Sequence, residues 1–391
     1  MVTECGVDST RCDPAMSFRS LSRARYEHRE LGTEIKCFLL WINCNMEYRL
    51  WIIYVQFLLQ FLKLYLVAAH QLFKELFLRF MSLLARDSTS DDYDASGLVA
   101  VVSGGLHGIG FETTRQLMAL GAHVIIGSVT LDPQKLTSLS AEFPMSKVSW
   151  FRLDLRSMRS VQNFAQKVQN CEVLIDMLIC NAGVMFVPYQ ETEDRFEMHM
   201  SVNYLGHCLL TCLLMPKFRR GARVVNVTSC VHKATSINFG DIHSRQTYSR
   251  YHGYCQSKRA QVLWSAALGR RLHKDVTVLC VHPGVVDSSL YRQVWWSPLV
   301  SGLLFKAEDE GAAVVVRVAI GPQFADAHGA YIEDCQIKLR AQDAEEDCLW
   351  TATWDMLKPW TSPDCIHAGK SLLNLCPQWN ICEKRKWLTL K

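Results

Sequence analysis

The sequence predicts an α/β fold in which a doubly wound parallel sheet follows an N-terminal membrane-associated helix. Three observations support this fold class. Short apolar runs alternate with helical patterns from residue 98 onward, a glycine-rich turn follows the first run, and polar residues stand at the carboxyl ends of later runs. Apolar runs without alternation are typical of strands that are buried on both faces of a parallel sheet.

Composition excludes several other classes of protein. The chain has 391 residues, of which 49% are hydrophobic and 20% charged, so we expect a large core rather than disorder. Its net charge of +4 is modest and no dense Lys/Arg stripe occurs, which argues against nucleic acid as a partner. The 16 cysteines are scattered without Cys-x-x-Cys spacing, so we expect thiols in a reducing compartment and no metal site.

The N-terminal apolar stretch begins at Leu50 and runs to about Ala69. It could just span a bilayer, but the polar side chains within it make insertion marginal. At about 100° per residue, one stripe of a helix collects the polar residues Arg49, Gln56, Gln60, Lys63, His70 and Lys74. Three interpretations stay open: an interfacial helix with this stripe toward the headgroups, a spanning helix with the stripe toward a partner, and a helix packed on the protein's own core. We expect membrane association, at the endoplasmic reticulum or a lipid droplet.

A polar, acidic linker near residues 88–94 separates this segment from the first strand. We therefore divide the chain into a polar extension (1–49), a membrane-associated helical segment (50–86), a nucleotide-binding domain (97–340) and a C-terminal extension of unknown role (341–391).

The first βαβ unit carries a glycine-rich turn between an apolar run at 98–102 and a helical pattern that ends near Gly121. A second apolar run follows at 123–126. Glycines let the backbone approach a pyrophosphate, whose charge the helix N-terminus stabilises, although a plain tight turn would look similar. The candidate cofactor-binding residues of the turn are Ser103, Gly104, Gly105, His107, Gly108, Ile109 and Gly110.

Four further strands are expected at 148–153, 176–180, 223–227 and 276–281. Because the carboxyl ends of parallel strands meet at one edge of the sheet, the residues that follow each run are candidates for a ligand crevice. They are Asp154-Leu155, Asn181-Ala182-Gly183, Thr228-Ser229 and Pro283-Gly284.

Tyr254 and Lys258 stand four residues apart, so a helix places them on one face. A phenol has an ordinary pKa of about 10 and needs help to exchange protons near neutrality. An ammonium one turn away would favour the phenolate. The pair alone is weak evidence for catalysis, and its significance depends on the elements around it.

In this order, the glycine turn, Asn181-Ala182-Gly183, Ser229, Tyr254-x-x-x-Lys258 and Pro283-Gly284 resemble the short-chain dehydrogenase/reductase family, with its Rossmann-type domain, across residues 97–335. Stretches at 184–185, 201–207 and 283–286 are similar to its retinol-dehydrogenase-like branch. The resemblance implies NAD(P)-dependent interconversion of alcohols and carbonyls, often on lipophilic substrates.

The resemblance also implies roles for individual residues. Tyr254 would exchange the proton with the substrate oxygen, and Lys258 would lower the pKa of Tyr254 and bind the nicotinamide ribose. Ser229 would hold the substrate oxygen, and Asn203 would support a water that relays protons toward Lys258. The cofactor contacts would be Asp154 and Leu155 at the adenine, Asn181, Ala182 and Gly183 at the ribose, Pro283, Gly284 and Val286 at the nicotinamide, and Ser288 at its carboxamide or the phosphates.

Less specific readings compete at single positions. Ser229 could be a strand-end hydroxyl, Asn203 a helix residue that bonds backbone, and Asp154 a helix N-cap. We expect three histidines to be packing or surface residues rather than ligands: His199, His207 and His232.

This sequence departs from the family pattern in three places. Ser103 replaces a Thr, and Cys180 stands where many members have an Asn. After the second strand, residues 127–130 offer neither an acid for a ribose 2′-hydroxyl nor an Arg for a 2′-phosphate. The coenzyme is therefore NAD or NADP, with a slight preference for NADP because His107 or Ser128 could contact a phosphate.

The segment from Ser289 to Phe305 is apolar, with Trp295 and Trp296 at its centre. It predicts a lipophilic alcohol or aldehyde as the substrate, although the segment could instead pack the core or the subunit interface of a homo-oligomer. Two other functions stay open: a catalytically silent nucleotide-binding scaffold, and an epimerase or dehydratase on the same fold.

Overall fold

The computed structural model describes residues 51, 54–78, 93–272, 275–294, 297, 304–338 and 344–361. The chain divides into two compact units, residues 1–58 and 59–391. The described part of the first unit is the beginning of helix α1 (54–78), and the second unit holds the rest of α1 and all other elements. Trp295 and Trp296 lie outside the described residues.

The second unit is built on an eight-stranded sheet with the strand order β3-β2-β1-β4-β5-β6-β7-β8. Every neighbouring pair is parallel except β7 and β8. The predicted doubly wound sheet is thus confirmed. The strands are β1 (Val99–Ser103), β2 (His123–Ser128), β3 (Val148–Arg152), β4 (Ile175–Cys180), β5 (Phe218–Val227), β6 (Val276–His282), β7 (Tyr331–Glu333) and β8 (Gln336–Lys338).

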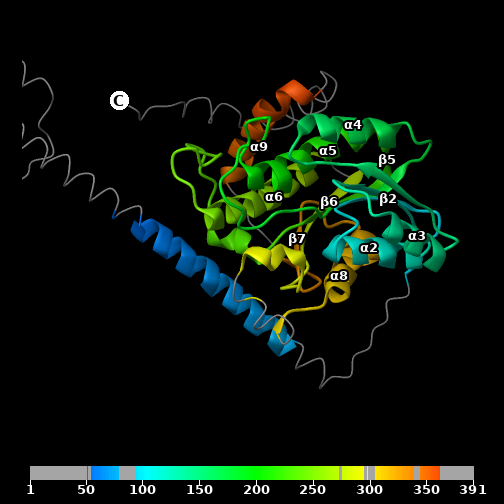
Figure 1. Cartoon of the computed structure of the whole chain (residues 1–391), viewed down its shortest axis with the longest axis horizontal. Helices are drawn as coiled ribbons and strands as arrows, with labels where there is room; N and C mark the ends of the chain where they lie inside the picture. Colours follow the sequence, from blue (N-terminus) through cyan, green and yellow to red (C-terminus); the bar gives the residue numbers. More distant parts are fainter. Residues whose placement is uncertain are drawn as a thin grey trace, which may run out of the picture. The chain divides into compact units, whose positions relative to one another are not determined.

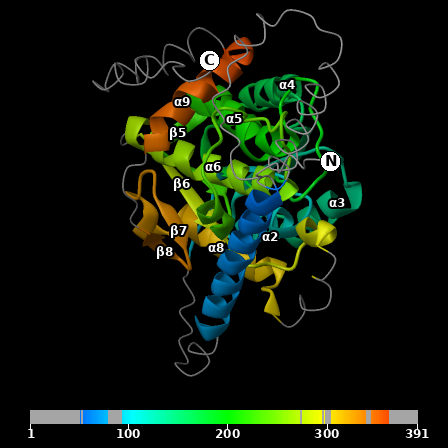
Figure 2. The same cartoon turned by 90° about the vertical axis from the view of Figure 1, so that its left-hand side faces the viewer.

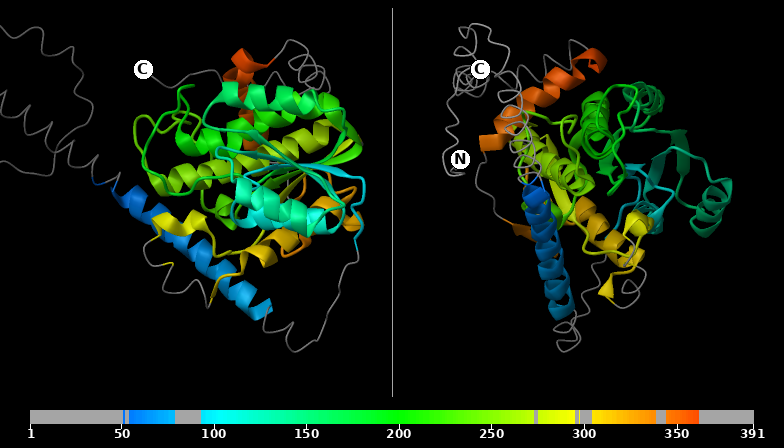
Figure 3. Two further views of the ribbon diagram at one scale, coloured as in Figure 1. Left: turned by 45° about the vertical axis from the view of Figure 1, so that its right-hand side comes forward. Right: turned by 60° about the vertical axis from the view of Figure 1, so that its left-hand side comes forward.

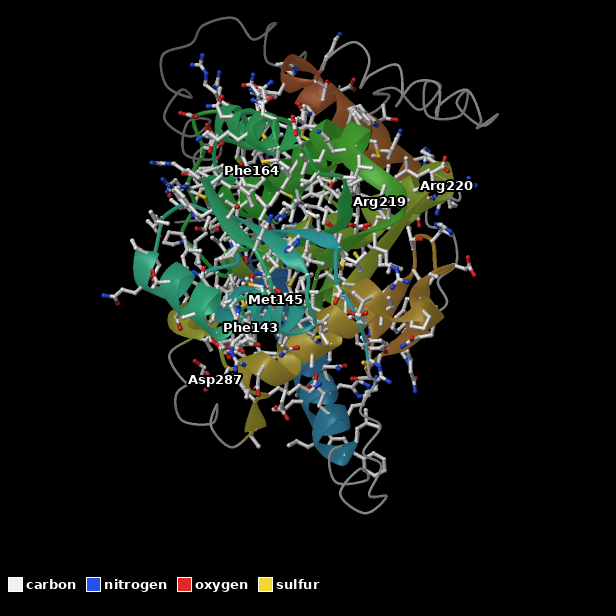
Figure 4. The ribbon with its side chains drawn as sticks, turned by 90° about the vertical axis from the view of Figure 1, so that its right-hand side faces the viewer. Phe143, Met145, Phe164, Arg219, Arg220 and Asp287 are labelled. Atoms are coloured by element: carbon white, nitrogen blue, oxygen red, sulfur yellow. The ribbon has the colours of Figure 1, made fainter. Side chains whose placement is uncertain are left out.

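Helices cover both faces of the sheet (Figure 1). One face carries α2 (Gly108–Ala119), α3 (Pro133–Glu142) and α8 (Glu308–Ile320), and the other carries α4 (Met158–Gln169), α5 (Gly206–Leu214) and α6 (Arg250–Leu272). Each face has its own apolar core, because the strand side chains alternate between the two. Phe164 of α4 is fully buried in one of these cores, edge-on to Phe151 of β3 (Figure 4).

Helix α9 (Ala344–Leu357) packs on α6 (Figure 3). Trp350 is 1% exposed in the core, with the Arg271 guanidinium 4.3 Å from its ring centroid. Three acidic residues in the first turn of α9 pair with three arginines of α6, and these pairs are Glu345–Arg259, Glu346–Arg270 and Asp347–Arg271. Part of the C-terminal extension, to which the sequence assigned no role, is therefore a covering layer of the domain.

Within the second unit, α1 lies against the domain rather than apart from it (Figure 2). Among the described residues, no helix is long and apolar enough to cross a bilayer. The predicted polar stripe divides: Gln60 and Lys74 contact the domain, whereas Lys63 and His70 are exposed. Residues 59–78 thus match the third interpretation, a helix packed on the protein's own core.

Candidate active site

A cavity of about 910 Å³ lies at the carboxyl ends of the parallel strands. Among the predicted site residues, those that line it are Gly104, His107, Gly108, Ile109, Asp154, Leu155, Asn181, Ala182, Gly183, Ser229, Tyr254, Lys258, Pro283, Gly284, Val286 and Ser288. Ser103, Gly105, Gly110 and Asn203 do not line the cavity. Their contacts place them beneath its wall, where they hold the lining residues in position.

The glycine turn fits a bound pyrophosphate. Gly104 has φ +70°, and a Cβ on Gly110 would lie 2.3 Å from the Gly104 carbonyl oxygen, so neither position accepts a side chain without strain. Helix α2 begins at Gly108, its N-cap His107 forms no side-chain cap, and its first turn holds no acidic residue. The positive end of this helix therefore faces the cavity ready for an anion.

Ser103 fixes the turn after β4 and determines the tautomer of His207. Its Oγ accepts hydrogen bonds from the main-chain N–H groups of Asn181 (2.9 Å) and Ala182 (3.1 Å). Because both lone pairs are then used, the hydroxyl proton goes to His207 Nε2 at 2.8 Å rather than to the more distant Ile179 oxygen at 3.4 Å. His207 Nδ1 consequently carries the ring proton and donates to the Asn203 main-chain oxygen at 3.1 Å.

The neutral state of His207 agrees with its surroundings. Burial, reinforced by the charge of Lys258, lowers the pKa of His207 to about 4. Sequence reasoning treated His207 as a packing residue, and it is one. It also links the glycine turn to the helix that carries Asn203, which no spacing rule would reveal.

Asn203 lies in a π-helical turn (Met200–Leu205) that leads into α5. Its side chain accepts from Val184 N (2.8 Å) and donates to Val184 O (3.0 Å) and Ser257 Oγ (2.9 Å). All its side-chain bonds therefore hold the 181–184 segment against α6. Its main-chain oxygen is the acceptor of the His207 Nδ1–H.

Tyr254 and Lys258 lie on one face of α6, with Lys258 Nζ 5.9 Å from the Tyr254 ring centroid. Burial lowers the pKa of Lys258 to about 8, and its ammonium donates to Val227 O at 3.0 Å. Burial raises the pKa of Tyr254 well above its ordinary value, and a hydrogen bond with Ser229 only partly opposes this. The direction is opposite to the one expected from Lys258 alone, because desolvation of the phenolate outweighs the charge.

One end of the cavity is bounded by Asp154 and Leu155. The Asp154 carboxylate accepts three bonds from Arg156, which lower the pKa of Asp154. The N-cap of α4 is Ser157, so Asp154 does not fill that role. Ser128 Oγ accepts from Trp150 Nε1 (2.8 Å) and donates its proton to Thr130 O (2.7 Å), so the Ser128 hydroxyl has no proton left to donate to a 2′-phosphate.

The opposite end of the cavity is apolar. Tyr254 belongs to a buried cluster with Leu64, Met185, Phe186, Cys230, Val231, Ala234, Cys255 and Val294. From the segment that the sequence singled out, the cavity wall takes Ser289, Leu290, Tyr291, Gln293, Val294 and Phe305. Cys180 is buried in β4 outside the cavity wall, and burial raises the pKa of its thiol to about 12.

Residues 98–296 match the short chain dehydrogenase family, and the chain belongs to this family. It is an NAD(P)-dependent dehydrogenase/reductase. Mouse polyprenol dehydrogenase is 38% identical over 66% of this chain and 79% of its own length. Human retinol dehydrogenase 12 is 37% identical over 67% of this chain and 86% of its own length. The resemblance to the retinol-dehydrogenase-like branch is confirmed.

A solved structure agrees with the fold. An uncharacterized protein from Mycobacterium paratuberculosis is 29% identical, with a TM-score of 0.56, and the match covers 69% of this chain and 96% of that one.

One wall of the cavity was not expected from the sequence. Five residues of α1 line it: Leu64, Tyr65, Ala68, Ala69 and Leu72. The helical periodicity of α1 was visible in the sequence, but its partners are far away in the chain, and Glu75 bonds Val285 across 210 residues.

Proposed function

We propose that the protein interconverts an alcohol and a carbonyl on a lipophilic substrate of the retinoid, polyprenoid or steroid-like kind. The observation that carries this proposal is the position of Tyr254, which lines the cavity and belongs to its apolar cluster. Bound NAD(P) would donate or accept the hydride. Relatives named for polyprenol and retinol support an apolar substrate.

Each residue of the site has a distinct task in this proposal. Tyr254 exchanges the proton at the substrate oxygen, and Ser229, already hydrogen-bonded to Tyr254, holds that oxygen in reach. Lys258 is mostly charged at neutral pH because its pKa is about 8, so it stabilises the phenolate against the effect of burial. The Asn203 main-chain oxygen supports the water that passes protons toward Lys258.

The coenzyme would lie with its pyrophosphate at the N-terminus of α2 and its adenine against Asp154 and Leu155. The nicotinamide end would meet Pro283, Gly284 and Val286, with Ser288 near its carboxamide or the phosphates. His107 lines the cavity and is the candidate donor for an extra phosphate, so we place NADP ahead of NAD. The ratio of kcat/KM for the two coenzymes tests this order.

We also propose that the protein acts at a membrane, of the endoplasmic reticulum or a lipid droplet. The outer face of α1 carries large exposed apolar side chains, among them Leu66 (61% exposed) and Phe73 (72% exposed). Such a face suits the boundary between headgroups and acyl chains. The full chain would then float with phosphatidylcholine vesicles in a density gradient, and the paired variant Leu66→Ser, Phe73→Ser would float less.

Turnover tests the main proposal. Reduction of NADP or NAD is followed with retinol, geranylgeraniol and a steroid alcohol, using wild type, Tyr254→Phe and the control Tyr189→Phe, whose phenol bonds Glu191 at the surface. We expect Tyr254→Phe to lose turnover while it still binds coenzyme, and Tyr189→Phe to retain both. Equal turnover in all three proteins removes Tyr254 from the mechanism. Coenzyme binding without turnover of any alcohol or aldehyde favours a silent scaffold.

A further inference from the structure

Helix α1 has three functionally different sides between residues 59 and 78. Leu64, Gln71 and Glu75 are each no more than 3% exposed, at spacings of seven and four residues, and form its inner side. The opposite, outer side carries the exposed apolar residues Leu59, Leu62, Leu66, Phe73 and Phe77. The flank between these two sides lines the cavity.

Polar contacts hold the inner side on the domain. Both Glu75 carboxylate oxygens lie 3.2 Å from the main-chain N–H of Val285, and Lys306 Nζ is 3.5 Å from Glu75 Oε2. Lys74 pairs with Glu333 at 2.9 Å. Val285 directly follows Pro283-Gly284, so α1 is anchored at the nicotinamide end of the cavity. Such buried, multiply bonded charges fix a helix in one position rather than letting it slide.

The cavity-lining flank is apolar along its whole length. It begins at Leu64, which packs in the cluster of Tyr254, and continues through Ala68 and Leu72. Tyr65 and Ala69 lie further round the helix, toward the outer side, and still line the cavity. At about 100° per residue, Ala69 is nearly adjacent to Leu62 and Phe73 of the outer side. Apolar side chains therefore follow one another round α1, from Leu64 in the cluster of Tyr254 to the exposed outer side.

We propose that this flank of α1 is the track along which the chain of a long substrate leaves the cavity, and that Ala68 determines which chain lengths are accepted. This inference rests on the proposed function and adds the element that selects the substrate. Ala68 and Ala69 have the smallest side chains among the five α1 residues that line the cavity. A bulky residue at Ala68 would block the track about one helical turn from Leu64, without touching the glycine turn.

The test compares prenol, with five carbons, and geranylgeraniol, with twenty, in the full chain with NADP. We expect wild type to prefer geranylgeraniol. In Ala68→Trp, kcat/KM is expected to fall at least about tenfold more for geranylgeraniol than for prenol, mainly through KM, because a chain that cannot enter its track loses binding energy. His70→Trp is the matched control: the exposed His70 does not line the cavity, and this variant keeps the wild-type ratio.

Equal losses for the two alcohols in a coenzyme-binding Ala68→Trp protein would overturn the inference. If that variant no longer binds coenzyme, Ala69→Leu carries the same expectation. Equilibrium dialysis with labelled alcohols separates this inference from the proposed function. Wild type that binds geranylgeraniol but turns over none of the three lipophilic alcohols refutes the function, and the effect of Ala68→Trp on binding still decides the track. Wild type that does not bind geranylgeraniol refutes the track, and turnover of retinol or the steroid alcohol then still decides the function.

Discussion

Lys258→Met is expected to change how stability depends on pH. Burial lowers the pKa of Lys258 from 10.5 to about 8. Below about pH 8 this lysine is protonated in both the folded and the unfolded protein, so the buried charge lowers the free energy of unfolding by its full amount. Between about pH 8 and 10.5 the folded protein has released the proton while the unfolded chain still holds it, so this lysine's contribution to stability rises with pH.

The size of this effect follows from the pKa. The decrease in the pKa of Lys258 from 10.5 to about 8 corresponds to about 3 kcal/mol of folding free energy. Methionine keeps the length of the side chain without its charge. The variant loses the hydrogen bond to Val227 O, worth about 1 kcal/mol, yet we expect it to be more stable than wild type at pH 7. The difference should shrink and then reverse as pH approaches 10.5.

Urea unfolding of the coenzyme-free protein, followed by tryptophan fluorescence at intervals from pH 7 to 10, measures this difference. Subtracting the curves of the two proteins cancels every other titrating group. Lys147→Met, at an exposed position, is the matched control for the loss of one lysine. A wild-type-to-variant difference that stays constant from pH 7 to 10 would refute the reasoning, because it would mean that Lys258 is not strained by burial.

Three other variants probe neighbouring features. Gly110→Ala places a Cβ 2.3 Å from the Gly104 oxygen, so we expect it to lower the free energy of unfolding by about 1–3 kcal/mol and to weaken coenzyme binding. In the control Gly240→Ala the nearest atom is 3.5 Å from the new Cβ, and neither property is expected to change. Urea midpoints and coenzyme titration measure the two effects. Glu308→Gln removes a carboxylate beside the start of α2, so coenzyme affinity rises about two- to threefold at low salt and less at high salt. Trp350→Ala leaves a cavity under α9 and lowers the free energy of unfolding by about 3–5 kcal/mol, measured in urea.

The strands were predictable because uninterrupted apolar runs have few alternatives in an α/β chain. Six of them appear within a few residues of the expected positions, although β5 begins at Phe218, ahead of the predicted 223. Strands β7 and β8 were missed. Each has three residues, and β7 ends in Glu333, so neither forms an apolar run.

The site was predictable as a set of residues but not as a set of contacts. Order along the chain brings the candidate residues to one edge of the sheet, and most of them line the cavity. Sequence could not separate lining residues from those beneath the wall, such as Ser103 and Asn203, since that difference depends on where each hydrogen bond goes. It also could not orient α1, because Glu75 and Lys74 find partners that only the folded domain brings near.

The position of α9 limits how two copies of this protein could meet. Its ion pairs and Trp350 occupy the outward surface of α6, the helix that carries Tyr254 and Lys258. A second chain therefore cannot use that part of α6 for pairing unless α9 first detaches. A chain that ends before residue 344 lacks α9, so the three arginines of α6 and the space that Trp350 fills would both be exposed. Such a truncated protein would be a candidate for self-association through this surface of α6.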